Sequence, residues 1–305
     1  MPDAFPRGRF VWHELLTPDP DLAARFYPQV TGWKVQASDD PTYRLWMAGK
    51  TRSGGLMALP EEAKRMGAPP QWMAYVAVPD AADTVRQAQS LGARVYTPVQ
   101  DISWGRFATL ADPQGAPFSV FQPAPGGEGT TDTPTRGGFS WHELDASDGR
   151  AAWAFYQRLF GWEEAESMDM GPQGTYLTFK RAGTKAQIGG IYTRAPATPG
   201  KPHWLSYVFV ANADAVARQV KAAGGTVVNG PMDVPGGGRI AQCVDPQGAA
   251  FAVHSAGATP AKRRPTRKAK PKPKAKAKPA KKATAKKSKK KPARKPARRA
   301  RARRR

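Results

Sequence analysis

The chain has 305 residues, enough for two domains of ordinary size and a tail. Its net charge of +24 is uneven, because 25 of the 48 Lys and Arg residues lie between Lys262 and Arg305, where there is no Asp or Glu. The other 23 basic residues stand against all 24 acidic ones, so residues 1–261 are close to neutral. The single cysteine, Cys243, excludes an internal disulfide and a cysteine-cluster metal site.

Neither a signal peptide nor a membrane span is predicted. Residues 1–5 (MPDAF) lack a basic segment followed by an apolar run, and no apolar stretch reaches the ~20 residues that cross a bilayer. We therefore expect a cytoplasmic protein with no membrane partner.

The first half of the chain predicts a mixture of strands and helices. Residues 9–16 alternate like a strand, and Leu22, Phe26 and Val30 recur at helical spacing before the stop at Gly32. Further predicted strands are 42–48, 56–59, 72–78, 94–97, 106–111 and 117–121, with a helix at 81–91, a linker at 60–70 and a Gly54-Gly55 break.

The second half repeats this plan. Phe10–Leu15 (FVWHEL) returns as Phe139–Leu144 (FSWHEL), and the other matched pairs are Phe26-Tyr27 with Phe155-Tyr156, Gly32-Trp33 with Gly161-Trp162, and Asp112–Gly115 (DPQG) with Asp245–Gly248 (DPQG). Helices are predicted at 151–160 and 214–223 and a strand at 205–210. A repeat of this length indicates a duplicated domain, each copy being two strand–helix–strand units of roughly 55–60 residues.

These motifs resemble the vicinal oxygen chelate superfamily, which includes glyoxalase I, extradiol dioxygenases and bleomycin-resistance proteins. The Trp-His-Glu-Leu entry and the Gly-Gly step are similar to its tandem glyoxalase-like subgroup. The resemblance implies an α+β fold of four βαβββ units. We expect one domain at residues 7–123, a linker at 124–135, a second domain at 136–256 and a disordered basic tail at 257–305.

The resemblance also implies where metal ligands would stand: His or Gln on the first strand of a unit and Glu on its last. Those positions fall on Trp12, Trp141, Met73, Leu205, Ser119 and Ala252. None is a usual ligand for a divalent metal, so we predict no metal and no other cofactor. A shift of one residue would bring in His13 and His142, although no carboxylate partner would then follow on the last strands.

Trp12 and Glu14 share one face of their predicted strand, as do Trp141 and Glu143. An aromatic wall beside a carboxylate can bind a cationic or hydrogen-bonding ligand, or act as a base. A structural glutamate satisfied by hydrogen bonds is the alternative.

Three further side chains are candidates. His254 shares a face with Ala252 and could form an acid–base dyad with Glu143, or serve as a hydrogen-bonding residue at a strand end. Arg106 and Arg239 open equivalent strands and could bind an anionic ligand, or form surface salt bridges.

The tail resembles the basic arms of linker histones. It contains six prolines from Pro265 to Pro296 and no aromatic residue, so it cannot stack on bases. We expect disorder and sequence-independent binding to nucleic acid phosphates, with a solubilising role as the alternative. The residues expected to bind are Lys262, Arg263, Arg264, Lys286, Lys287, Lys289, Lys290, Lys291, Arg298, Arg299, Arg301, Arg303, Arg304 and Arg305.

The sequence thus favours metal-independent binding of an unknown small molecule by a nucleoid-associated protein. One alternative is a glyoxalase-like lyase or dioxygenase that uses Glu14 or Glu143 with a divalent metal. Another is a protein whose tail compacts nucleic acid.

Overall fold

The computed structural model describes residues 7–125, 134–171, 174–196, 198 and 200–257; the basic tail lies outside these ranges. The first copy contains β1 (Phe10–Thr17), α1 (Pro20–Thr31), β2 (Lys34–Ala37), β3 (Tyr43–Ala48), β4 (Thr51–Ala58), α2 (Glu61–Arg65), β5 (Gln71–Ala77), α3 (Ala81–Ser90), β6 (Arg94–Ile102), β7 (Gly105–Ala111) and β8 (Pro117–Pro123). The second contains β9 (Phe139–Ala146), α4 (Gly149–Phe160), β10 (Trp162–Asp169), β11 (Thr175–Arg181), β12 (Gln187–Thr193), β13 (His203–Phe209), α5 (Ala213–Ala222), β14 (Thr226–Val234), β15 (Gly238–Val244) and β16 (Ala250–Ala256).

Each copy forms one eight-stranded sheet. The strand orders are β2-β3-β4-β1-β5-β8-β7-β6 and β10-β11-β12-β9-β13-β16-β15-β14. In each sheet the first strands of the two units, β1 with β5 and β9 with β13, pair antiparallel at the centre. The predicted α+β fold of four βαβββ units is confirmed.

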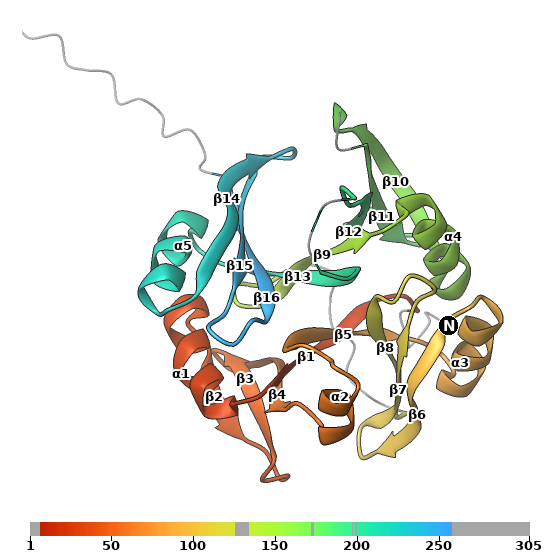
Figure 1. Cartoon of the computed structure of the whole chain (residues 1–305), viewed down its shortest axis with the longest axis horizontal. Helices are drawn as coiled ribbons and strands as arrows, with labels where there is room; N and C mark the ends of the chain where they lie inside the picture. The colour runs from red at the N-terminus through yellow and green to blue at the C-terminus, as the bar shows by residue number, and fades with distance from the viewer. Residues whose placement is uncertain (1–6, 126–133, 172–173, 197, 199, 258–305) are drawn as a thin grey trace, which may run out of the picture. The chain divides into compact units, whose positions relative to one another are not determined.

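The helices on the outer faces of the sheets pair across the two copies, α1 beside α5 and α3 beside α4 (Figure 1). Consequently, each large core combines half of one copy with half of the other. One core joins Phe26 and Trp46 to Val216 and Phe251, and the other joins Phe118 to Phe160 and their neighbours. Neither copy therefore buries its own helices alone.

The repeated sequence motifs make reciprocal hydrogen bonds between the copies. Tyr27 on α1 donates to Asp245 Oδ2 (3.1 Å) in the turn before β16, and Tyr156 on α4 donates to Asp112 Oδ2 (3.1 Å). The Gly-Trp motifs do the same, because Trp33 Nε1 donates to Gly137 O. In the matching bond, Trp162 Nε1 donates to Gly8 O. These motifs hold the two copies together.

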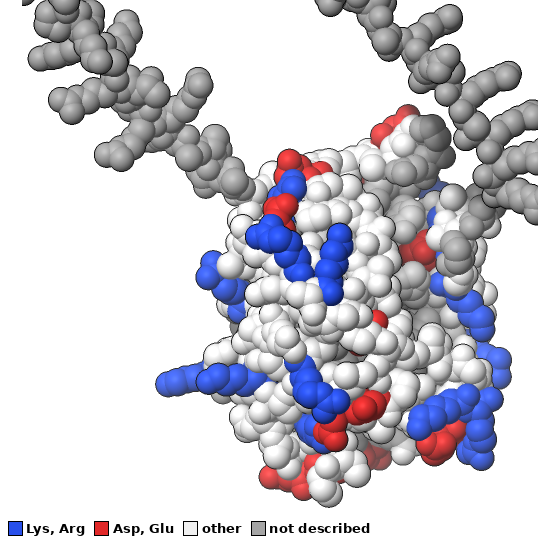
Figure 2. Space-filling view, turned by 60° about the vertical axis from the view of Figure 1, so that its left-hand side comes forward, with Lys and Arg blue, Asp and Glu red and all other residues white. Residues whose placement is uncertain are grey.

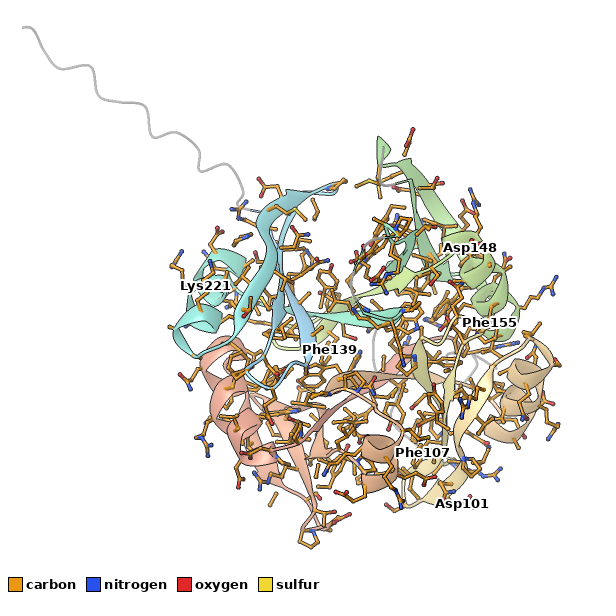
Figure 3. The ribbon with its side chains drawn as sticks, in the orientation of Figure 1. Asp101, Phe107, Phe139, Asp148, Phe155 and Lys221 are labelled. Carbon is orange, nitrogen blue, oxygen red and sulfur yellow. The ribbon has the colours of Figure 1, made fainter. Side chains whose placement is uncertain are left out.

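A histidine pair lies where the two sheets meet. His13 Nε2 and His142 Nε2 are 2.8 Å apart, and each side chain is 5% exposed. Phe139 stacks on His13 and Phe10 on His142, each with ring centroids 3.6 Å apart, and Phe139 lies near the middle of the molecule (Figure 3). His142 Nδ1 is 3.0 Å from the Ile188 carbonyl oxygen, which can only accept, so we assign the proton of neutral His142 to Nδ1. His142 Nε2 is then the acceptor, and His13 Nε2–H donates to it.

The structure differs from the sequence-based expectation in three places. Gly54 and Gly55, expected to form a break before a strand, lie inside β4 (Thr51–Ala58). The edge strands β2 and β10 were not predicted, because β2 is short and the exposed Glu163 and Glu164 give β10 no apolar alternation. The segment 60–70, expected to be a linker, contains the short helix α2, which lies on the inner face of the first sheet (Figure 1). Here the inner face means the side of each sheet opposite its packed outer helices.

Candidate functional site

The inner face of the first sheet carries a glutamate surrounded by aromatic donors. Glu14 is 9% exposed and accepts a hydrogen bond from Tyr75 on the neighbouring strand β5 (2.8 Å). Tyr43 on β3 also donates to Glu14 and accepts from Trp12 Nε1 at 2.9 Å. Alternation on β1 therefore puts Trp12 and Glu14 on one face and His13 on the other.

The second sheet repeats this network and extends it. Glu143 accepts hydrogen bonds from Tyr176 (2.8 Å) and Tyr207 (2.9 Å), and Trp141 Nε1 donates to Tyr176. Gln242 on β15 adds a third donor to Glu143 at 3.0 Å. The equivalent residue of the first sheet is Thr109, which instead shares a hydrogen bond with Ser119.

Burial raises the pKa of both carboxyl groups, and the tyrosine hydrogen bonds oppose that shift. For Glu143, the nearby charge of Asp145 raises the pKa further, whereas Gln242 lowers it. Each carboxyl is thus held in a low-dielectric setting but satisfied by neutral donors. The arrangement can orient a ligand on the aromatic side chains, and it gives each glutamate a raised affinity for a proton.

The Gly-Gly step on β4 and β12 makes room for these tyrosines. A Cβ on Gly55 would collide with the Tyr43 hydroxyl, and one on Gly190 would collide with the Tyr176 ring. Only glycine lets the phenol lie across its neighbouring strand and reach the glutamate. The Gly-Gly pair is therefore a packing requirement of the site rather than a break between strands.

We expect Gly190→Ala to displace Tyr176 from Glu143 and to destabilise the protein by about 1–3 kcal/mol through overpacking. Urea unfolding measures the change. In a Tyr176→Ala background the same substitution should cost much less, because the colliding ring is gone. An equal cost in both backgrounds would contradict this role for the glycine.

The structure does not bring Glu143 and His254 together. His254 lies beside Ser140 Oγ at 3.1 Å. The strand register places His254 four residues along β16 from the level of Glu143, about 13 Å along the strand. The predicted acid–base dyad is wrong, because the hydrogen-bonding neighbours of Glu143 are Tyr176, Tyr207 and Gln242.

The two candidate arginines do not reach the inner faces either. Arg239 forks onto Asp214 of α5, with N–O distances of 2.6 and 2.9 Å, and also binds Asp233. Arg106 pairs with Asp101 at 2.9 Å. Their neighbours Ile240 and Phe107 take the inner positions, so both arginines form the salt bridges that were the alternative to anion binding.

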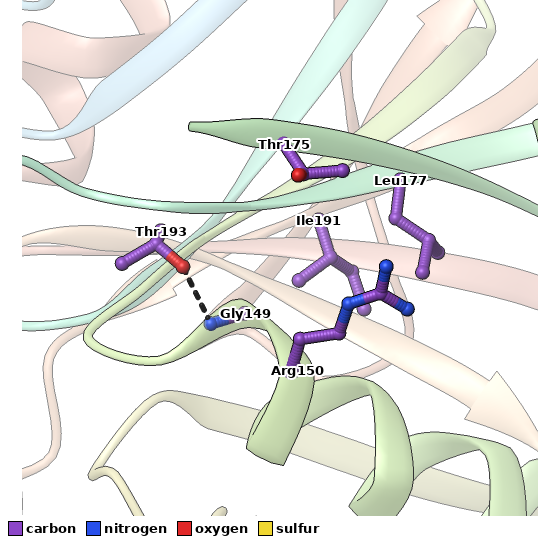
Figure 4. Close-up of a pocket in the computed structure, with 6 residues that line it drawn as sticks. All are labelled: Gly149, Arg150, Thr175, Leu177, Ile191 and Thr193. Carbon is purple, nitrogen blue, oxygen red and sulfur yellow. Dashed lines mark hydrogen bonds between the residues drawn. The ribbon is translucent and has the colours of Figure 1, made fainter. Parts of the chain in front are cut away.

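A pocket of about 100 Å³ lies beside the start of α4. It is lined by Gly149, Arg150, Thr175, Leu177, Ile191 and Thr193 (Figure 4). Its strand residues alternate with Tyr176 and Tyr192, so the pocket is on the outer face and separate from Glu143. It has room for a few waters at most.

The tyrosines and Gln242 were absent from the sequence-based candidates. A usable signal existed, because Tyr43 and Tyr176, and Tyr75 and Tyr207, occupy matching positions in the two copies. Their convergence on one glutamate depends on strand pairing between β1 and β5, which sequence spacing does not give.

Comparison with known proteins agrees with this architecture. Residues 11–121 match the model of the glyoxalase-like domain, and residues 139–253 match that of the glyoxalase/bleomycin resistance protein/dioxygenase superfamily. CFP32 of Mycobacterium tuberculosis, a candidate glyoxylase by name, is 34% identical over 248 residues, which are 79% of this chain and 92% of CFP32. The chain belongs to this superfamily.

Two further proteins extend the comparison. The anthracycline biosynthesis protein DauV of Streptomyces sp. (strain C5) is 30% identical over 266 residues, covering 82% of this chain and 94% of DauV. The Mn(II)-bound glyoxalase from Novosphingobium aromaticivorans has a TM-score of 0.59 at 15% identity and covers 82% of this chain and 83% of its own. The latter likeness shows the fold alone.

The inner faces do not fit the divalent metal of the superfamily's metal enzymes. Around Glu14 and Glu143 the donors are phenols, an indole and an amide, whereas such metals take imidazole and further carboxylates. His13 and His142 lie on the opposite faces, bonded to each other. Within the ranges that the structure describes, no three His, Cys, Asp or Glu side chains form a group that could hold a metal ion.

Proposed function

We propose that the protein binds a small molecule on the inner face of its sheets without a metal ion. The observation that carries this proposal is the repeated Trp–Tyr–Glu–Tyr network, in which neutral donors occupy the carboxylate. Trp141, Tyr176 and Tyr192 are only partly buried, so aromatic surface is available to a ligand. Aromatic side chains beside placed polar groups are typical of small-molecule sites.

A screen of metabolites by thermal shift, with and without a chelator, tests this proposal. We expect at least one ligand to stabilise the chelator-treated protein, because a ligand that binds only the native state raises its stability. The double variant Glu14→Gln/Glu143→Gln should lose that shift, whereas Glu163→Gln, on the exposed edge strand β10, should keep it. A shift that appears only with added divalent metal would favour the lyase or dioxygenase alternative.

We also propose that the tail holds the protein on nucleic acid. On the face seen in Figure 2, the Lys and Arg side chains of the described body are scattered among Asp and Glu. The 25 basic residues between Lys262 and Arg305, with no acidic residue among them, are the matching polycation. Binding of this kind depends on phosphates and is independent of sequence.

Within the ranges that the structure describes, no helix is long and apolar enough to span a bilayer.

A further inference from the structure

The two inner faces differ at one end. Leu16 pairs with Gln71 across the central strands, and Asp145 pairs with His203 in the same way. Leu59 N donates to Thr17 O and Arg194 N to Ala146 O, so Leu59 and Arg194 are also equivalent. An apolar pair in the first copy is therefore an oppositely charged pair in the second.

In the first sheet this end is closed by the chain itself. Leu16 and Leu59 are buried and pack with Met73 against Ala63 of α2 and Ala68, which follows it. The residues that pack around Leu16 and Leu59 there are apolar. No helix equivalent to α2 occurs in the described residues between β12 and β13.

In the second sheet the same end is ionic and buried. Asp145 is 5% exposed and Arg194 is 8% exposed, with Arg194 Nε 3.6 Å from Asp145 Oδ1. His203 Nδ1 lies 3.8 Å from Asp145 Oδ2, and the Tyr192 hydroxyl also bonds this carboxyl. Among the residues that the structure describes, Asp145 Oδ1 has no hydrogen-bond partner, although it faces Arg194 Nε at 3.6 Å.

Such an arrangement is costly unless something completes it. Charges lose hydration when buried, and a well-packed apolar pair is often at least as stable as a buried ion pair. The first copy contains that apolar pair, so the fold does not require charges at this end. The rings of Tyr176 and Tyr192 are partly buried and nearly parallel, with centroids 6.1 Å apart and 14° between their planes. Beside them, Asp145 Oδ1 lacks a hydrogen-bond donor among the described residues, so it is suited to a ligand that brings one.

We propose that ligand binds to the second sheet, where Asp145 accepts its hydrogen bond, and that the ligand is a neutral aromatic compound with an N–H or O–H donor. This inference rests on the proposed function and narrows it. The ligand is expected to be neutral because the Arg194 guanidinium already balances the charge of the Asp145 carboxylate. The aromatic ring follows from the Tyr176 and Tyr192 side chains that flank the acceptor.

Four compounds that share a benzene ring and differ in the attached group test the ligand class: benzamide, methyl benzoate, benzoate and benzamidine. Titration followed by amide NMR shifts on β9, β11 and β12 should show benzamide binding about tenfold or more tightly than the other three, the size expected for a hydrogen bond to a charged group. Tightest binding by benzamidine or benzoate would show that a charged ligand is preferred and would overturn the proposal.

The double variant Asp145→Leu/Arg194→Leu recreates Leu16 and Leu59 of the first copy, so it should fold. In it, benzamide should bind no better than methyl benzoate. Glu163→Gln should leave the preference unchanged. Equal shifts from all four probes would overturn this inference alone, whereas no shift on either inner face from any probe would count against the proposed function as well.

Discussion

Deletion of residues 258–305 is expected to abolish binding to double-stranded DNA at physiological salt. The full chain should bind duplexes of unrelated sequence equally, because the tail has no aromatic residue to stack on bases. With ~8 phosphates engaged, the slope of log K against log salt is about −7, so affinity falls by about 10³- to 10⁵-fold between 50 and 200 mM salt. Fluorescence anisotropy with random 30-base-pair duplexes measures both quantities.

Graded variants make this test sharper. Replacing Lys286, Lys287 and Lys289–Lys291 by alanine removes five charges and should reduce the steepness of the salt slope without introducing sequence preference. Removing five exposed basic residues of the body is the matched control and should change little. If the truncated protein keeps the affinity and salt slope of the full chain, the body binds the DNA and the tail does not.

Acidification from pH 7 to pH 5 is expected to destabilise the fold through the His13–His142 pair. Burial lowers the pKa of both imidazoles: that of His142 falls to about 3, and that of His13 falls well below its usual value, also through repulsion from His142. The unfolded chain therefore binds more protons below pH 6.5, and stability is lost as pH falls from 6.5 toward the folded pKa values. The loss is about 1.4 kcal/mol per pH unit for each histidine once pH is well below 6.5.

Denaturant unfolding across this pH range tests the assignment. Burial raises the pKa values of Glu14 and Glu143, which acts in the opposite direction nearer pH 5, so the informative quantity is the difference between variants. His13→Leu/His142→Leu should remove most of the loss between pH 7 and pH 5. His203→Asn, at a partly exposed histidine, should retain it. An unchanged pH dependence in the double variant would show that the pair takes up protons as readily in the folded state as in the unfolded state, and that other groups control acid stability.

The sequence predicted the fold well because its signals are local. Alternation around Trp12, the helical spacing of Phe26 and the stop at Gly32 arise within one strand or one helix. Prediction was weaker where partners come from distant strands. Tyr75 and Glu14 meet only through the pairing of β1 with β5, and the Phe-Tyr motif meets the Asp-Pro-Gln-Gly turn of the other copy.

The functional candidates show the same division. Assigning faces by alternation separated Glu14 from His13 correctly, because strand geometry determines it. The dyad of Glu143 with His254 failed because sharing a face does not fix the position along the strand. The choice between a salt bridge and anion binding at Arg239 stayed open in the sequence because its partner, Asp214, lies on α5 rather than on the sheet. The polar end around Asp145 and Arg194 went unnoticed because its contrast with Leu16 and Leu59 appears only when the registers are compared.

The metal content of the purified protein, measured by mass spectrometry together with ligand binding after chelation, tests metal independence most directly. We predict less than about one tenth of an equivalent of any divalent metal and ligand affinity unchanged by the chelator, since the groups around Glu14 and Glu143 are phenols and an amide rather than the imidazoles and carboxylates such metals require. A stoichiometric, tightly held metal whose removal abolishes ligand binding would contradict this function.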